Sequence, residues 1–188
     1  MKKVISSRDN DARRGEEAKM DVLEAIRNRR SVRKYRPGNI PNEKLEIILE
    51  AARLAPSAAN RQPWRFVVVQ KEDKKQALAE AANNQTFIKD AAAIVAAVGD
   101  PDISAKWYEK DTMIALEHMV LAATALGYGT CWIGAFNEDA VKSLLKIPER
   151  AKVVALLPIG VSNETPGPKP RKELPEIFFK EEWQSLWC

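Results

Sequence analysis

The sequence predicts a layered α+β or α/β sandwich in which helices cover a small sheet. Its 188 residues suit one sizeable core better than two. Short β-branched runs alternate with longer segments of helical periodicity, and no segment is repeated, which argues against a bundle, a barrel or a repeat array. We therefore expect a single domain over residues 20–188, preceded by an arm of mixed charge over residues 1–19.

The first half of this domain is predicted to contain three helices and a strand. Apolar residues recur at helical spacing over residues 20–29 and again after Pro41, where Pro56 ends the second helix. Residues 66–69 are short and β-branched, which indicates a strand, and the alanine-rich residues 74–82 favour a helix.

A buried strand and a largely apolar helix are expected next. Residues 93–98 form an uninterrupted apolar run of strand length. Residues 111–126 are apolar on nearly every side and end at Gly127, which is typical of a helix with a C-terminal glycine cap. One subunit of this size offers too little cover for such a helix, so we expect a homodimer.

The last part of the chain is predicted to become progressively less regular. Residues 130–133 suggest a strand or turn, residues 138–145 a short helix, and residues 153–161 a buried strand. Pro158 would place that last strand near an edge of the sheet. Residues 164–171 hold three prolines and should lie extended across a surface.

Composition narrows the possible functions. The formal net charge is +4, which suits an anionic ligand without requiring nucleic acid. Cys131, Cys188 and the single His118 cannot build a disulfide framework or a histidine metal cluster, so we expect no metal. The chain also lacks an apolar run long enough for a membrane span and an apolar leader, which predicts a cytoplasmic protein with no membrane partner.

Residues 27–36 carry six cations in ten positions. They could simply be solvated charges that interact favourably with the C-terminal end of the first helix. Alternatively, the guanidinium groups and the Ser31 hydroxyl could converge on a phosphate. RNA binding is a third possibility, but it usually uses interleaved aromatic residues, and this stretch has only Tyr35.

Residues 56–64 form a proline-bracketed loop that carries serine, asparagine and glutamine side chains. The loop could be a plain connection between a helix and a strand. Its amide and hydroxyl groups are also suited to recognising a flat heterocycle with alternating donors and acceptors, such as the pyrimidine ring of a flavin.

Residues 127–134 contain three glycines, which mark turns or places where the backbone approaches a ligand closely. Neither a Gly-x-Gly-x-x-Gly fingerprint nor a P-loop is present. We interpret Cys131 as a core residue and His118 as a structural histidine. Because no convincing nucleophile or acid–base set remains, we expect either a binding protein or an enzyme whose cofactor carries the chemistry.

Four segments together resemble the FMN-dependent nitroreductase family over about Met20 to Ile177. The first is Arg-Arg-Ser-Val-Arg-Lys-Tyr at residues 29–35, and the second is Ala-Pro-Ser-Ala-Ala-Asn-Arg-Gln-Pro-Trp at residues 55–64. The third runs from a Leu-Ala-Ala helix into Gly-Tyr-Gly-Thr-Cys-Trp-Ile-Gly at residues 121–134, and the fourth is Lys-Pro-Arg-Lys at residues 169–172. Tyr128 departs from the small aliphatic residue that many relatives carry.

The resemblance implies a three-layer α/β/α sandwich with a central mixed sheet, assembled as an intertwined homodimer with FMN at the subunit interface. The FMN phosphate and ribityl chain would bind at Arg29, Arg30, Ser31, Arg33, Lys169 and Arg171. The partner subunit would contribute the loop residues Pro56, Ser57, Ala58, Asn60 and Gln62. The backbone at Ile133, Gly134 and Ala135 would lie beside the flavin ring.

The activity implied by the resemblance is that of an FMN-dependent oxidoreductase. NADH or NADPH would deliver hydride to flavin N5, and an electron-poor acceptor such as a nitroaromatic or a quinone would then receive it, with no catalytic side chain required. Within the same fold, a reductive dehalogenase, a flavin-consuming enzyme and a flavin sensor remain alternatives. A nucleic-acid-binding module is an alternative from a different class.

Overall fold

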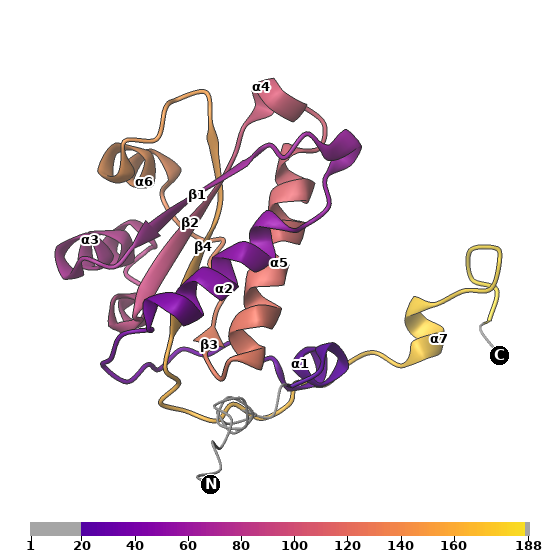
Figure 1. Ribbon diagram of the computed structural model, residues 1–188. Helices are drawn as coiled ribbons and strands as arrows, with labels where there is room; N and C mark the ends of the chain where they lie inside the picture. The colour runs from indigo at the N-terminus through magenta and orange to yellow at the C-terminus, as the bar shows by residue number, and fades with distance from the viewer. Residues whose placement is uncertain (1–19, 187–188) are drawn as a thin grey trace, which may run out of the picture.

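The computed structural model describes residues 20–186, which form a four-stranded sheet with helices on both faces (Figure 1). The predicted arm over residues 1–19 and Cys188 lie outside the described residues. The strand order is β1-β2-β4-β3. The strands are β1 (Trp64–Val69), β2 (Ala93–Gly99), β3 (Gly129–Thr130) and β4 (Lys152–Gly160).

The neighbouring strands of this sheet are all paired antiparallel. Within residues 20–186, the parallel component of the predicted mixed sheet is limited to an isolated bridge between Ser31 and Thr130. It does not extend because the chain soon diverges, and Tyr35 pairs antiparallel with Ser162.

The predicted edge position of the last strand is wrong. β4 lies between β2 and β3, and Pro158 is accommodated because β3 pairs only with Ile159 and Gly160. Ile133 bridges to Leu156 on the other side of the proline. Pro158 therefore falls between the two places where a backbone donor is needed on this side.

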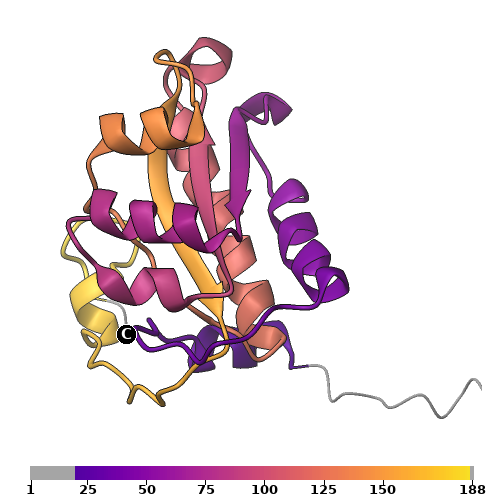
Figure 2. The same ribbon diagram turned by 90° about the vertical axis from the view of Figure 1, so that its left-hand side faces the viewer.

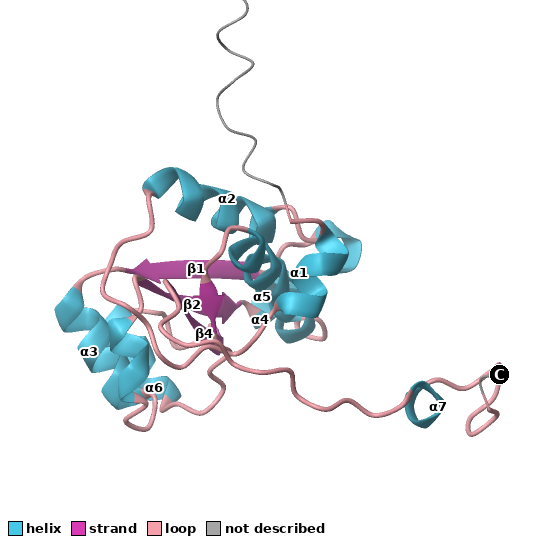
Figure 3. Ribbon diagram, turned by 90° about the horizontal axis from the view of Figure 1, so that it is seen from below, coloured by secondary structure: helices cyan, strands magenta, loops and turns pink. Residues whose placement is uncertain are grey.

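The predicted three-layer arrangement is confirmed (Figures 2 and 3). One face is covered by α2 (Asn42–Arg53) and α5 (Tyr108–Ala125), with α1 (Val22–Asn28) against α5. The other face is covered by α3 (Glu72–Ala81), η2 (Thr86–Asp90) and α6 (Glu138–Leu145). The shorter elements are η1 (Ala58–Asn60), α4 (Pro101–Ser104) and α7 (Leu174–Ile177).

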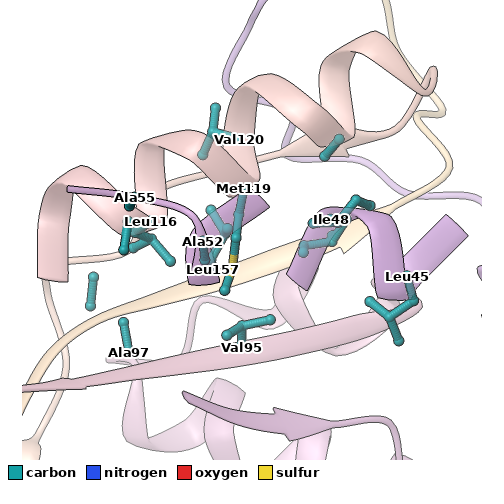
Figure 4. Packing of buried hydrophobic residues seen from close by; sticks show 14 of the residues in the cluster. Leu45, Ile48, Ala52, Ala55, Val95, Ala97, Leu116, Met119, Val120 and Leu157 are labelled. Carbon is teal, nitrogen blue, oxygen red and sulfur yellow. The ribbon is translucent and has the colours of Figure 1, made fainter. Parts of the chain in front are cut away.

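The core on the α2 and α5 face follows the apolar spacing of the sequence. Ile48 and Ala52 of α2 pack with Leu116 and Met119 of α5 over the sheet residue Leu157 (Figure 4). The opposite side of α5 is different, because Met113 and Ile114 remain 40% and 41% exposed. The structure thus leaves these two apolar side chains of the helix partly uncovered.

Two structural features are absent from residues 20–186. None of the helices there combines the length and the apolar character needed to cross a bilayer. Among the same residues, no three histidine, cysteine, aspartate or glutamate side chains lie close enough to hold a metal ion.

Candidate functional site

A cavity of about 670 Å³ opens between the end of α1 and the extended segment that follows β4. All six residues predicted to hold a phosphate and its attached chain line it: Arg29, Arg30, Ser31, Arg33, Lys169 and Arg171. Arg27 and Glu164 line it as well. The structure therefore brings together two sequence motifs that lie more than 130 residues apart.

The C-terminal end of α1 determines how the first arginines are presented. Asp21 caps the start of α1 by accepting the Glu24 backbone N–H at 2.8 Å. At the other end, Arg30 Nη1 donates to the carbonyls of Arg27 and Arg29 at 2.7 and 2.9 Å. Arg30 thus also serves the helix end, as the simpler interpretation of these cations proposed.

Arg30 still retains unused binding capacity. Its Nε atom is buried and has no hydrogen-bond partner within the described chain. An unpaired guanidinium N–H away from water is costly unless a ligand or an ordered water satisfies it.

The residues after α1 are held by strand-like contacts. The Val32 backbone N–H donates to the Thr130 carbonyl at 2.9 Å, beside the Ser31–Thr130 bridge. A Cβ atom on Gly129 would come within 2.8 Å of a Val32 methyl group. A glycine is therefore needed at position 129 for Ser31 and Arg33 to lie where they do.

The far wall of the cavity is tied to the same basic segment. Arg36 N–H donates to the Val161 carbonyl at 2.9 Å, and Asn163 N–H donates to the Lys34 carbonyl at 2.8 Å. The Glu164 carboxylate accepts the Arg33 backbone N–H at 2.5 Å. These contacts direct the segment with Lys169 and Arg171 along the cavity.

The charge of the cavity is strongly positive. Six cationic side chains line it, namely Arg27, Arg29, Arg30, Arg33, Lys169 and Arg171, against the single carboxylate of Glu164. No ion pair involving these six cations is found within residues 20–186. Converging guanidinium groups with a hydroxyl among them suit the oxygens of a phosphate group, so the residues fit a phosphorylated cofactor.

Cys131 lies behind this cavity as a core residue. Burial raises the pKa of its thiol above the ordinary value, while Arg33, a hydrogen bond with Ser31, and Arg29 oppose that rise without cancelling it. The thiol is therefore protonated near neutral pH, as expected for a small core residue.

The loop predicted to recognise a flat heterocycle is held in an unusual backbone conformation. Ala59, Asn60 and Gln62 have φ values of 50°, 54° and 49°, in the left-handed region that non-glycine residues rarely occupy. The side-chain Nε2 atom of Gln62 donates to the Asn60 backbone carbonyl and to Asn60 Oδ1, both at 3.1 Å. Backbone strain of this kind is often found at ligand sites.

A buried carboxylate anchors the loop. Asp111, in the first turns of α5, is 3% exposed, and its two oxygens accept the Ala58 backbone N–H at 3.3 and 3.2 Å. At the end of the loop, the Pro63 carbonyl accepts the Asp100 backbone N–H at 2.8 Å. Asp111 has no role that its sequence context predicts, because its only signal there is an acidic residue at the start of an apolar helix.

The loop and the cavity do not meet within the chain. Asp111 holds the loop near the start of α5, whereas Ser31 bridges to Thr130, which follows the end of α5. These two points are about 20 Å apart along the helix, because an α-helix rises about 1.5 Å per residue. Figure 1 shows the loop beside α4 at one end of the molecule and α1 at the other.

The third predicted group, Ile133, Gly134 and Ala135, belongs neither to the loop nor to the residues that line the cavity. Ile133 is buried and bridges to Leu156, while Gly134 and Ala135 are exposed. The Ala135 carbonyl accepts a hydrogen bond from Gln85 Nε2 at 3.1 Å, and a Cβ on Gly134 would meet nothing within 4 Å.

His118 was interpreted as a structural histidine. Its Nδ1 atom lies 3.1 Å from the Ala51 carbonyl, a contact between α5 and α2.

The fold and the site define an α/β/α sandwich protein with a cationic cavity suited to a phosphorylated ligand. The family model described as "Nitroreductase family" matches residues 26–100 and 82–161. The chain belongs to the nitroreductase family.

Individual relatives agree with this assignment. A Methanothermobacter thermautotrophicus protein with the provisional name NADH dehydrogenase/NAD(P)H nitroreductase is 33% identical over 90% of this chain and 91% of its own length. A nitroreductase family protein from Clostridium novyi NT shares 37% identity, with a TM-score of 0.71 over 89% of this chain and 97% of that one. NADPH:FMN oxidoreductase from Vibrio harveyi, solved with NAD+, has a TM-score of 0.81 at 26% identity, covering 88% and 79%. The predicted class of NAD(P)H-dependent oxidoreductase is confirmed.

Proposed function

We propose that the protein is an FMN-dependent NAD(P)H oxidoreductase that works as a homodimer and reduces electron-poor acceptors such as nitroaromatics and quinones. The observation that carries the proposal is the cavity where Arg29, Ser31 and Arg33 meet Lys169 and Arg171. The Vibrio harveyi relative is an NADPH:FMN oxidoreductase by name, and its structure contains NAD+.

When bound, FMN supplies a ring whose N5 accepts hydride from a reduced nicotinamide and later transfers it to the acceptor. Arg29, Arg33 and Arg171 would bind the FMN phosphate, with the Ser31 hydroxyl donating a further hydrogen bond. Lys169 would contribute charge from the other wall of the cavity. These residues hold the cofactor in place and take no part in the bond-making steps.

The loop at residues 57–62 would come from the partner subunit. The side chains of Asn60 and Gln62 offer the donors and acceptors that a flavin pyrimidine edge requires. The Asp111 anchor keeps that array rigid, so less conformational freedom is lost on binding. We further propose that the backbone at Ile133, Gly134 and Ala135 lies beside the flavin ring. The N–H groups of Gly134 and Ala135 would donate to the ring, because the Ile133 N–H already donates to the Leu156 carbonyl at 2.9 Å.

Two features support the homodimer. The first is the distance of about 20 Å between loop and cavity, which a second copy of the chain can bridge by bringing its loop to this cavity. The second is the set of exposed apolar side chains on α1, α2 and the C-terminal segment. It comprises Val22, Leu23, Ile26, Ile47, Leu54, Leu174, Ile177 and Phe178.

The visible absorbance spectrum of the purified protein tests this function. We expect a flavin spectrum that bleaches after anaerobic addition of NADH or NADPH, with FMN as the released chromophore. The double variant Arg29→Ala with Arg33→Ala should lose most of its FMN affinity, because two charge-assisted contacts are removed. As a control, Lys71→Ala with Lys146→Ala removes two exposed cations near the other face of the sheet.

Three results would contradict the proposal. A colourless protein that fails to bind added FMN would exclude the cofactor. Flavin that stays oxidised with both nicotinamides would indicate a sensor instead of a reductase. Unchanged FMN affinity in the arginine double variant would exclude the phosphate site at this cavity.

A further inference from the structure

An exposed tryptophan with two lysines stands at the start of α5. Trp107 is 39% exposed. The Nζ atoms of Lys106 and Lys110 lie 5.4 and 5.0 Å from the centre of its indole ring. An exposed aromatic surface with two ammonium groups beside it is a cation–π arrangement that also leaves positive charge at the surface.

This cluster adjoins the strained loop. Asp111, which accepts the Ala58 N–H, donates its own backbone N–H to the Trp107 carbonyl at 2.9 Å. The segment that leads into Trp107 begins at Asp100, whose N–H binds the Pro63 carbonyl after the loop. Figure 1 shows the loop, α4 and the start of α5 together at one end of the molecule.

The two lysines are not neutralised by the acidic residues nearby. Neither forms an ion pair with a carboxylate in the described part of the chain, and Lys110 Nζ donates only to the Lys106 carbonyl at 3.4 Å. The Asp100 and Asp102 carboxylates lie 4.0 and 3.5 Å from Arg150 Nε instead. Both ammonium groups are therefore available to a ligand.

We propose that Trp107, Lys106 and Lys110 form a specificity site for ligands that combine an aromatic ring with negative charge. The ring would stack on the indole, and the anionic group would draw the lysine side chains away from it. This inference rests on the proposed function, because the loop would carry the cluster to the flavin of the partner subunit. The cluster would then determine which molecules reach that flavin.

Two reaction partners share this chemistry. One is an aromatic acceptor with an acidic substituent, such as 4-nitrobenzoate. The other is NADPH, whose adenosine carries a 2′-phosphate that NADH lacks. Matched pairs of ligands separate the two, because nitrobenzene and NADH are their counterparts without the extra charge.

The first test is the double variant Lys106→Gln with Lys110→Gln. We expect its KM for the charged member of one pair to rise about fivefold, with kcat and the KM of the uncharged member nearly unchanged, as partly exposed ion pairs are modest. The pair that shows the effect identifies the ligand. The control, Lys71→Gln with Lys146→Gln, removes the same charge elsewhere and should leave both pairs unchanged.

The second test concerns the indole. Trp107→Ala should raise KM for both members of the affected pair by about fivefold, whereas Trp107→Phe should restore most of the loss, because a stacking ring is retained. If Trp107 had only a structural role, Trp107→Ala would instead lower the flavin content of the protein and would lower kcat for every substrate alike.

Calorimetric titration provides a readout that does not depend on turnover. The probes are 4-nitrobenzoate and adenosine 2′,5′-bisphosphate, added to the flavin-loaded protein. Binding of one of them, weakened in the lysine and Trp107→Ala variants, is the expected result. If neither probe binds, or if binding and KM are the same in the variants, the specificity site is excluded. If the wild-type protein neither binds FMN nor oxidises a nicotinamide, the proposed function itself fails.

Discussion

The charge of Glu164 is opposite in sign to that of the other charged side chains that line the cavity. Glu164 places a carboxylate in a cavity lined by six cations and accepts the Arg33 backbone N–H at 2.5 Å. Glu164→Gln keeps an oxygen acceptor for that N–H but removes the negative charge. We therefore expect FMN to bind about two- to fivefold more tightly, a modest gain because the site is partly exposed to solvent.

Fluorescence titration of the apoprotein with FMN would measure this change. Glu164→Ala is the matched control, because it removes both the charge and the acceptor, and its affinity should fall below that of Glu164→Gln. A weaker affinity in Glu164→Gln than in the wild-type protein would show that the charge itself holds the cavity in place.

Ala59 shows what residue type alone could not reveal. Its φ of 50° is left-handed, although nothing in its identity predicts this, since glycine is the residue usually expected there. Ala59→Gly should raise the free energy of unfolding by about 0.5 kcal/mol, as the relieved strain slightly exceeds the added freedom of the unfolded chain. Ala58→Gly, at the helical residue next to it, should lower that free energy by about 0.5–1 kcal/mol.

Urea denaturation would measure both variants. The opposite signs are the informative outcome, since a loss of stability in Ala59→Gly would mean that the loop adopts a different backbone. If the rigid loop serves cofactor binding as proposed, Ala59→Gly should also bind FMN more weakly while being more stable.

At the scale of elements, α6 illustrates how side-chain chemistry joins a helix to the sheet. Its first residue, Glu138, accepts the Val153 N–H of β4 and also lies 3.1 Å from Lys142 Nζ. Burial acts to raise the pKa of Glu138, but Lys142 and the Val153 hydrogen bond outweigh it and lower that pKa below the ordinary value. Glu138 therefore stabilises the fold above its unfolded-state pKa, and this contribution is lost as the pH falls.

We expect the free energy of unfolding to decrease as the pH falls from the ordinary glutamate value of 4.5 through the lower folded-state value. In Glu138→Gln this part of the decrease should be absent, because the side chain no longer titrates. Urea denaturation from pH 7 to pH 3 would compare the two proteins. Parallel curves for both would show that Glu138 makes no such contribution.

The elements also show where sequence patterns succeed and where they fail. α6 begins and ends where it was predicted, because Asn137 caps it through an oxygen that accepts the Ala140 N–H. α5 begins at Tyr108, three residues before the predicted start, since charged residues in its first turn hide the apolar pattern. α7 was missed because it is a single four-residue turn just after the proline-rich residues 164–171, formed with a capping box between Glu173 and Glu176.

The residues of the candidate site also fall into some that the sequence predicts and some that it does not. Arg29, Arg30 and Arg33 around Ser31 suggested a phosphate by their short spacing, whereas Lys169 and Arg171 joined that group only through the resemblance to the nitroreductase family. Glu164 and Asp111 were not predictable, since each acts through a backbone N–H that only the folded chain brings near. Residue types therefore indicate the ligand, whereas the anchors depend on tertiary contacts.

At the scale of the whole molecule, the uncovered apolar surfaces and the separation between the loop and the cavity both support the proposed homodimer. A groove between α2 and α5 is lined by Ile47, Ala51, Leu54 and Ala122, with Glu43, Glu46 and Glu50 also in its lining, and Ile47 and Leu54 are 52% and 64% exposed. The C-terminal segment with α7 extends away from the sheet and its helices (Figure 3). Apolar surface of this extent is typical of an interface.

Sedimentation equilibrium should accordingly give twice the 21.1 kDa mass of one chain. Ile47→Glu with Leu54→Glu places two charges in the groove, so we expect a shift toward the monomer. Flavin content should fall in parallel, although neither residue lines the cationic cavity, because each proposed site needs a loop from the second subunit. The control, Gln76→Glu with Ser143→Glu, adds two charges on exposed positions of α3 and α6 and should stay dimeric. A wild-type monomer that retains FMN would contradict the shared site, because the loop and the cavity of one chain lie about 20 Å apart.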